Sequence, residues 1–115
     1  MARLEQTRPE LLLDRDLAGL WSRGRFVALY PLAYLILAYL ADHPRVIVRS
    51  TTLLQHCWDH LASVSDLYPY IHYLRVHVES DPHHPKIILT RRRLGYLYVP
   101  DHGVDRHPIR THGVS

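Results

Sequence analysis

Residues 86–99 have the sequence Lys-Ile-Ile-Leu-Thr-Arg-Arg-Arg-Leu-Gly-Tyr-Leu-Tyr-Val. This stretch is the most informative part of the chain for predicting the fold. Two short runs of apolar and β-branched residues flank Arg91, Arg92 and Arg93, and Gly95 follows at a position suited to a tight reversal. The pattern predicts a β-hairpin that carries three guanidinium groups at its tip. Such a hairpin suits a phosphate backbone, because Arg forms charged, bidentate hydrogen bonds to phosphate oxygens. Taken alone, the hairpin also fits a solvated turn whose arginines keep a sheet edge soluble.

The length and charge of the chain allow one small domain with a binding function. A chain of 115 residues, 47% of them hydrophobic, has enough apolar material for a single core. Its formal net charge of +3 permits nucleic-acid binding without requiring it. Ten histidines add ten further charges when protonated. We therefore expect any anion binding to tighten below about pH 6.5.

The composition favours a cytoplasmic protein that does not enter the membrane. Cys57 is the single cysteine, which excludes an internal disulfide, and its apolar-periodic surroundings predict a buried thiol. Residues 1–10 are polar, so we expect no signal peptide. The longest apolar run covers residues 30–41 and is too short to span a bilayer.

Nothing in the chain predicts an enzyme, a cofactor or a metal centre. A phosphate-cradling glycine loop, a Ser/His/Asp order and a carboxylate pair in a cleft are all missing from the sequence. His56 and His60 are spaced i, i+4, where both rings can reach one metal, and Asp59 is near. No third ligand is paired with them in sequence, so we expect surface histidines at a helix end.

The remaining patterns predict an α+β domain over residues 9–99, between a polar lead-in (1–8) and a flexible tail (100–115). Three strand candidates come first, separated by polar turns. Three helices follow: Pro31 opens the first, and Ser50 and Asp66 are the expected N-caps of the second and third. The expected strands are 11–13, 17–21 and 26–29, the extended link is 46–48, and the helices are 31–42, 51–60 and 67–79.

The first predicted helix, residues 31–42, is apolar around almost its whole circumference. A helix of this kind is either fully buried or covered by a partner, and full burial by its own chain is hard in a domain of this size. Leu35 and Ala38 are expected to be exposed in a monomer. The helix therefore suggests a homodimer or another covering protein, with unconstrained surface drift as the alternative.

Four motifs follow one another at fixed spacing and resemble those of a known family. They are Leu29-Tyr30-Pro31-Leu32 with Leu40-Ala41-Asp42-His43-Pro44, Leu53-Leu54 with Trp58, Leu74-Arg75 with Glu79-Ser80-Asp81-Pro82, and Thr90-Arg91-Arg92 with Gly95-Tyr96. Together with three strands, three helices and a terminal hairpin, they resemble the winged helix-turn-helix DNA-binding domain of OmpR/PhoB-type response regulators. The resemblance covers about residues 11–99 and implies transcription regulation in a two-component system. The acidic cluster of a phosphoacceptor receiver domain is not found within these 115 residues.

The resemblance implies that the third helix enters the major groove of double-stranded DNA while the hairpin, or wing, touches the backbone and the adjacent minor groove. It also implies that the loop at residues 59–65 faces RNA polymerase. Five cations serve as candidate phosphate contacts, which predicts a slope of about −4.5 for log K against log salt. These five are Arg75, Lys86, Arg91, Arg92 and Arg93. The full set expected to face DNA is Tyr70, His72, Tyr73, Arg75, His77, Lys86, Thr90, Arg91, Arg92 and Arg93.

The third helix departs from the family in its charge. Arg75 and Glu79 cancel, and tyrosines stand at positions 70 and 73, where the family places basic residues. These tyrosines, together with Tyr68, can pack on sugars, stack on unpaired bases or form a protein-binding patch. The alternative function is therefore a degenerate winged helix that binds another protein or dimerises.

Overall fold

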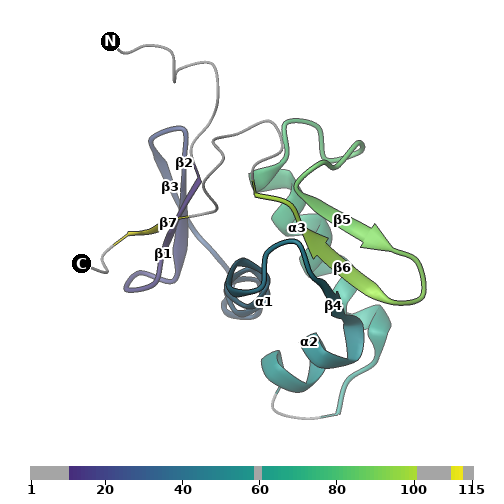
Figure 1. The fold of residues 1–115 in the computed structure, drawn as a ribbon. Coiled ribbons are helices and arrows are strands. Elements are labelled where there is room, and N and C mark those ends of the chain that lie inside the picture. Colours follow the sequence, from purple (N-terminus) through teal and green to yellow (C-terminus); the bar gives the residue numbers. More distant parts are fainter. Residues whose placement is uncertain (1–10, 59–60, 101–109, 113–115) are drawn as a thin grey trace.

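The computed structural model describes residues 11–58, 61–100 and 110–112, with two small sheets set around a helical core (Figure 1). One sheet has the strand order β3-β2-β1-β7 and the other the order β4-β6-β5. The expected order of strands, helices and terminal hairpin is confirmed. The elements are β1 (Leu11–Asp14), β2 (Gly19–Ser22), β3 (Arg25–Ala28), α1 (Pro31–Asp42), β4 (Ile47–Arg49), α2 (Ser50–Cys57), the 3₁₀ turn η2 (Val64–Leu67), α3 (Tyr68–Val78), β5 (Ile88–Arg91), β6 (Gly95–Tyr98) and β7 (Arg110–His112).

The first three strands form an antiparallel meander whose two turns have local causes. The buried carboxylate of Asp14 closes the first turn by accepting hydrogen bonds from Leu17 N (2.9 Å) and Trp21 Nε1 (3.1 Å). The second turn has two residues, Arg23 at φ 55° and Gly24 at φ 78°. Two successive positive φ values give a hairpin turn whose twist matches the flanking strands.

The strand β7 lies parallel to β1, with Leu12 opposite Arg110. Residues 110–112, which fall within the tail predicted over residues 100–115, lie at the edge of the N-terminal sheet. Residues 101–109 and 113–115, like the lead-in at 1–8, lie outside the described residues.

Helix α1 lies between the N-terminal sheet and the rest of the domain (Figure 1), and this position explains its composition. Its buried residues share one core with leucines of β1 and β2 on one side and with α2, α3 and β6 on the other. The chain itself covers most of this helix, which was expected to be hard in a domain of this size, because the helix is packed on two sides and so needs two apolar faces. Ala38 is buried, contrary to expectation, whereas Leu35 is exposed at 42%, as expected. The buried residues of α1 are Ala33, Ile36, Leu37, Ala38 and Leu40.

The starts of α2 and α3 differ from the sequence prediction. Ser50 is the first residue of α2 and not its N-cap, and the N-cap Arg49 makes no side-chain cap. Asp66 lies inside η2, where its carboxylate accepts a hydrogen bond from Ser63 N at 2.8 Å. The turn that precedes α3 therefore begins at Ser63. The expected extended link becomes the strand β4, because its residues pair with β6.

Cys57, the last residue of α2, is buried as expected. Within the part of the chain that the structure describes, none of the helices has the length and apolar content needed to cross a bilayer.

Candidate nucleic-acid interface

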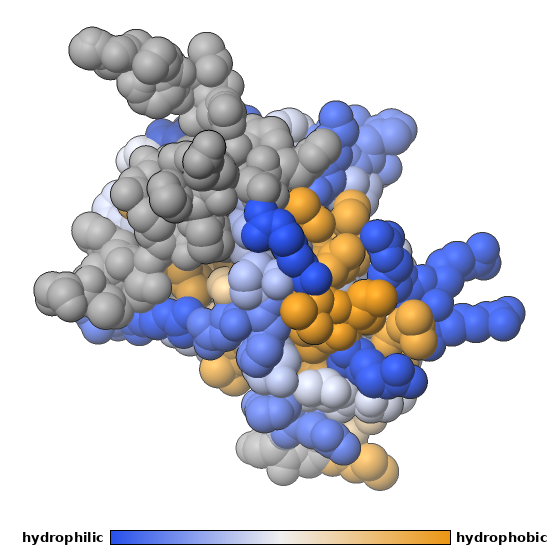
Figure 2. Space-filling view, viewed as in Figure 1, coloured by the Kyte–Doolittle hydropathy of each residue, from blue (hydrophilic) through white to orange (hydrophobic). Residues whose placement is uncertain are grey.

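The strands β5 and β6 pair antiparallel and form a hairpin, which we call the wing, with residues 92–94 at its tip. The predicted hairpin is confirmed. Leu94 N donates to Arg91 O at 2.9 Å, and Arg93 adopts the left-handed φ of 66°. The side chains of Arg91, Arg92 and Arg93 are exposed. Figure 2 shows hydrophilic side chains that project beyond the outer end of the hairpin.

Gly95 was expected to allow the tight turn of the hairpin, but the residue with a positive φ in this turn is Arg93. Gly95 therefore has a different structural role. Gly95 is buried in β6 opposite Arg49 of β4. A Cβ atom at this position would overlap the carbonyl oxygen of Val48 and lie 2.8 Å from Arg49 Cα. Only glycine allows the backbones of β4 and β6 to approach this closely.

Arg75 joins α3 to the wing. Its Nε and Nη2 atoms donate to Ile88 O at 3.0 and 2.7 Å, and Nη2 also donates to Thr90 Oγ1 at 2.8 Å. Partial burial lowers the pKa of this guanidinium, while the nearby Glu79 carboxylate opposes the shift. The guanidinium therefore holds strand β5 against α3, with Thr90 as a second anchor.

Glu79, the C-cap residue of α3, fixes the start of β5. Its buried carboxylate accepts hydrogen bonds from the backbone N–H groups of Lys86, Ile87 and Ile88, at distances between 2.7 and 3.1 Å. Sequence reasoning treated Glu79 only as a charge that cancels Arg75. The signal that it missed is an acidic residue placed between a helix end and a proline-containing turn.

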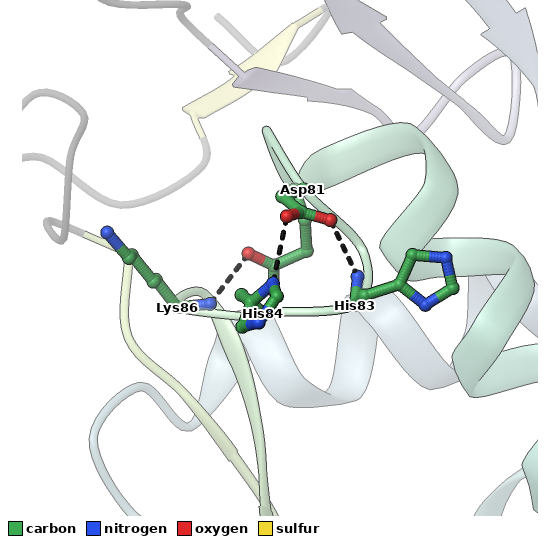
Figure 3. A network of polar contacts seen from close by, with 5 residues as sticks. Asp81, His83, His84 and Lys86 are labelled. Atoms are coloured by element: carbon green, nitrogen blue, oxygen red, sulfur yellow. Dashed lines mark hydrogen bonds and ion pairs between the residues drawn. The ribbon is translucent and has the colours of Figure 1, made fainter.

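The turn between α3 and β5 is closed by a second carboxylate (Figure 3). Asp81 accepts from His83 N at 3.0 Å and pairs with His84 Nδ1 at 2.9 Å. The hydrogen bond from the His84 ring, with the backbone N–H of His83 next in importance, holds the pKa of Asp81 below its usual value. In Figure 3 the Lys86 side chain extends away from this turn.

A groove of about 340 Å³ separates the wing from the starts of α2 and η2. Arg49, Arg91 and Arg93 line it, and Tyr68 at the start of α3 borders it. Arg49 was not expected at the site, and the pairing of β4 with β6 brings it there. The groove therefore combines three guanidinium groups with an aromatic ring and apolar walls. The other lining residues are Ser50, Thr51, Val64, Thr90, Leu94, Gly95 and Tyr96.

The predicted site residues of α3 separate into exposed and packed groups. His72 is exposed. The Tyr73 ring stacks on Tyr30 with centroids 4.7 Å apart and meets the His77 ring edge-on at 4.8 Å. Its hydroxyl lies 3.4 Å from Ala28 O. The side chains of Tyr73 and His77 therefore make contacts within the domain.

Tyr70 and Lys86 also lie apart from the wing tip. Tyr70 is half-buried, and its ring meets that of Trp58 edge-on at 5.7 Å. Lys86 is exposed but precedes Arg91 by five residues, which corresponds to roughly 16 Å of extended chain. Of the predicted site residues, the structure therefore brings Thr90, Arg91 and Arg93 together around one groove, and it leaves Lys86 at the opposite end of β5.

Among residues 11–58, 61–100 and 110–112, no group of three or more His, Cys, Asp or Glu side chains is arranged to hold a metal ion. The His56 ring lies against Tyr39, with centroids 4.6 Å apart, and the His43 ring lies against the same tyrosine at 4.3 Å. His60, the other half of the i, i+4 pair, lies outside the described residues.

Comparison with known proteins shows that the chain matches a protein family. Residues 24–98 match the model for "Transcriptional regulatory protein, C terminal". The DNA-binding response regulator MtrA of Mycolicibacterium smegmatis is 34% identical over 80 residues, which cover 68% of this chain and 35% of MtrA. The MtrA protein of Mycobacterium leprae is 35% identical over 79 residues, 67% of this chain and 35% of that protein. The chain thus spans about a third of the length of these curated relatives.

Solved structures of similar fold include DNA-bound domains. The RstA DNA-binding domain of Klebsiella pneumoniae, crystallised with the RstA box, has a TM-score of 0.66 and 26% identity, and the match covers 81% of this chain and 94% of that one. The C-terminal domain of the nisin resistance regulator NsrR has a TM-score of 0.62 and 30% identity, covering 76% and 89% of the two chains. The chain therefore belongs to the C-terminal, OmpR/PhoB-type winged helix-turn-helix DNA-binding domains of transcriptional regulators, a non-enzymatic family.

Proposed function

We propose that this chain binds double-stranded DNA with α3 in the major groove and the wing on the backbone and adjacent minor groove, and so regulates transcription in a two-component system. The observation that carries the proposal is the wing, whose three arginines are exposed and which is joined to α3 through the hydrogen bonds of Arg75 to Ile88 and Thr90. The RstA DNA-binding domain of similar fold, which was crystallised in complex with the RstA box, supports DNA as the ligand. The cytoplasmic location expected from the sequence is part of this proposal.

The side chains of the site take different roles from those expected at first. Arg49, Arg91, Arg92 and Arg93 are the phosphate contacts, since they surround the groove or extend from the wing tip. Arg75 positions the wing, because its Nε and Nη2 donors point to Ile88 and Thr90. Four phosphate contacts give a slope of about −3.6 for log K against log salt.

In this arrangement the exposed His72 faces the base edges, and Tyr68, the first residue of α3, lines the groove. The other residues expected at the interface act indirectly. Tyr70, Tyr73 and His77 support the position of α3 through their ring contacts.

A protein contact is the second candidate function, and the segment before α3 favours it. The Leu61 side chain is 98% exposed, and Val64 nearby is 39% exposed. These apolar side chains belong to the loop that the family resemblance assigns to RNA polymerase. A homodimer through α1 has less support, because Leu35 is the one large apolar side chain of this helix that is exposed.

Titration of labelled duplex DNA at several salt concentrations tests the proposal. We expect binding with a slope of about −3.6, and Arg92→Ala should reduce that slope by about 0.9 and weaken binding to all sequences. Arg25→Ala is the matched control, because it removes an exposed guanidinium from the other hairpin. Absence of binding at about 50 mM salt, where phosphate contacts are strong, would contradict the proposal.

A further inference from the structure

The exposed side of α3 carries an unusual set of side chains for a helix that reads DNA. Pro69, His72 and Val76, spaced i, i+3 and i+7, form one exposed stripe, which we call the outer stripe. Val76 is 51% exposed. The stripe lies opposite the side chains that α3 buries in the core, so it is the face available to a partner. The buried residues are Ile71, Leu74 and Val78.

Helix α3 lacks the side chains that recognise bases by paired hydrogen bonds. Guanine is read by Arg or Lys, and adenine by Asn or Gln. Between Tyr68 and Val78 the one residue of these types is Arg75, and its guanidinium donates to Ile88 and Thr90. The two ring nitrogens of His72 point in different directions, so this imidazole cannot make a bidentate pair of hydrogen bonds to one base edge.

The other two side chains of the outer stripe, Pro69 and Val76, are apolar, and the major groove also presents an apolar group. The C5-methyl group of thymine is the apolar group that base pairs present there. We propose that α3 selects its DNA site by contacts of Val76 and Pro69 with thymine methyl groups. This inference rests on the proposed function, because it assumes that α3 enters the major groove.

The charges around the stripe support DNA as its partner. The outer stripe contains no Lys, Arg, Asp or Glu, whereas Arg49, Arg91 and Arg93 line the groove at the N-terminal end of α3. Phosphates held in that groove would bring the outer stripe against base edges. Phosphate contacts then position the helix while the methyl contacts supply specificity.

Replacement of thymine by uracil tests the proposal, because it removes the methyl group and leaves the hydrogen-bonding edges unchanged. The duplex would be the tightest binder that the full chain selects from a random library. We expect binding to weaken about fourfold for each contacted methyl, since one buried methyl group is worth roughly this factor. The salt dependence should stay the same, because the phosphate contacts are unaltered.

Val76→Ala should bring the thymine-to-uracil affinity ratio close to one at its position, and alanine favours the helix, so folding is preserved. Val46→Ala is the matched control, since this valine is 55% exposed but lies before β4. The inference is wrong if the selected duplex binds equally well with uracil at every thymine, or if the ratio survives Val76→Ala. If no duplex binds at all, the proposed function fails with it.

Discussion

Arg75 in α3 and Ile88 in β5 are joined by two hydrogen bonds to one carbonyl oxygen, from Nε at 3.0 Å and from Nη2 at 2.7 Å. The two residues lie thirteen positions apart in the chain. This contact sets the distance between the helix and the hairpin that are proposed to grip the same DNA. Its loss should therefore alter stability as well as binding.

Replacement of Arg75 by Met should lower the free energy of unfolding by about 2 kcal/mol, because charged hydrogen bonds are lost and Ile88 O is left without its guanidinium partner. Urea unfolding followed by circular dichroism measures the change. Arg92→Met is the matched control at the exposed wing tip and should change stability by less than about 0.5 kcal/mol. Equal stability of the two variants would show that the Arg75 contact does not hold the wing.

Gly95→Ala should destabilise the domain by about 3 kcal/mol, because its new Cβ overlaps the backbone of β4 and the two strands must separate. Gly24→Ala is the control. Its Cβ meets no atom within 4 Å, and the cost is the left-handed φ of 78°, about 1 kcal/mol. Thermal unfolding of both variants checks the order. A Gly95→Ala protein as stable as Gly24→Ala would contradict the close approach of β4 and β6.

Local patterns in the sequence were enough to predict most of the elements. Pro31 and the apolar spacing after it mark α1 at its observed bounds, and the runs that flank the arginines mark the wing. Residue spacing could not show which side chains meet across the fold. Arg75 was expected on a phosphate for this reason, although strand β5 supplies its acceptors.

The apolar surface of α1 is a second case in which pattern alone was insufficient. The periodicity shows that the helix must be covered, but it does not say by what. The answer lies in the pairing of β1 with β2, which places Leu13 and Leu20 in the same core as α1. The strand β7 was missed because its partner, β1, lies about a hundred residues earlier in the chain.

Glu79→Gln should destabilise the domain by about 2 kcal/mol, because the amide group presents a donor to backbone N–H groups that need an acceptor. Hydrogen exchange measured by NMR should show faster exchange at the amides of Ile87 and Ile88, which bond to this carboxylate. Asp81→Asn is the control at an exposed carboxylate of the same turn and should leave these two amides protected. Unchanged exchange in Glu79→Gln would show that the carboxylate is not their main acceptor.

Cys57 should resist alkylation in the folded protein. Burial raises the pKa of its thiol from 9.0 to about 11, so at pH 8 the thiolate fraction falls about 100-fold, before any loss of access is counted. The raised pKa favours the folded state below about pH 9, and this contribution is lost as the pH rises through the folded value of about 11. Iodoacetamide labelling followed by mass spectrometry measures the effect, with the urea-unfolded chain as the control. Because the chain has a single cysteine, each added mass reports on this position alone. Equal labelling rates in the folded and unfolded chains would place the thiol in contact with solvent and contradict the packing of α2.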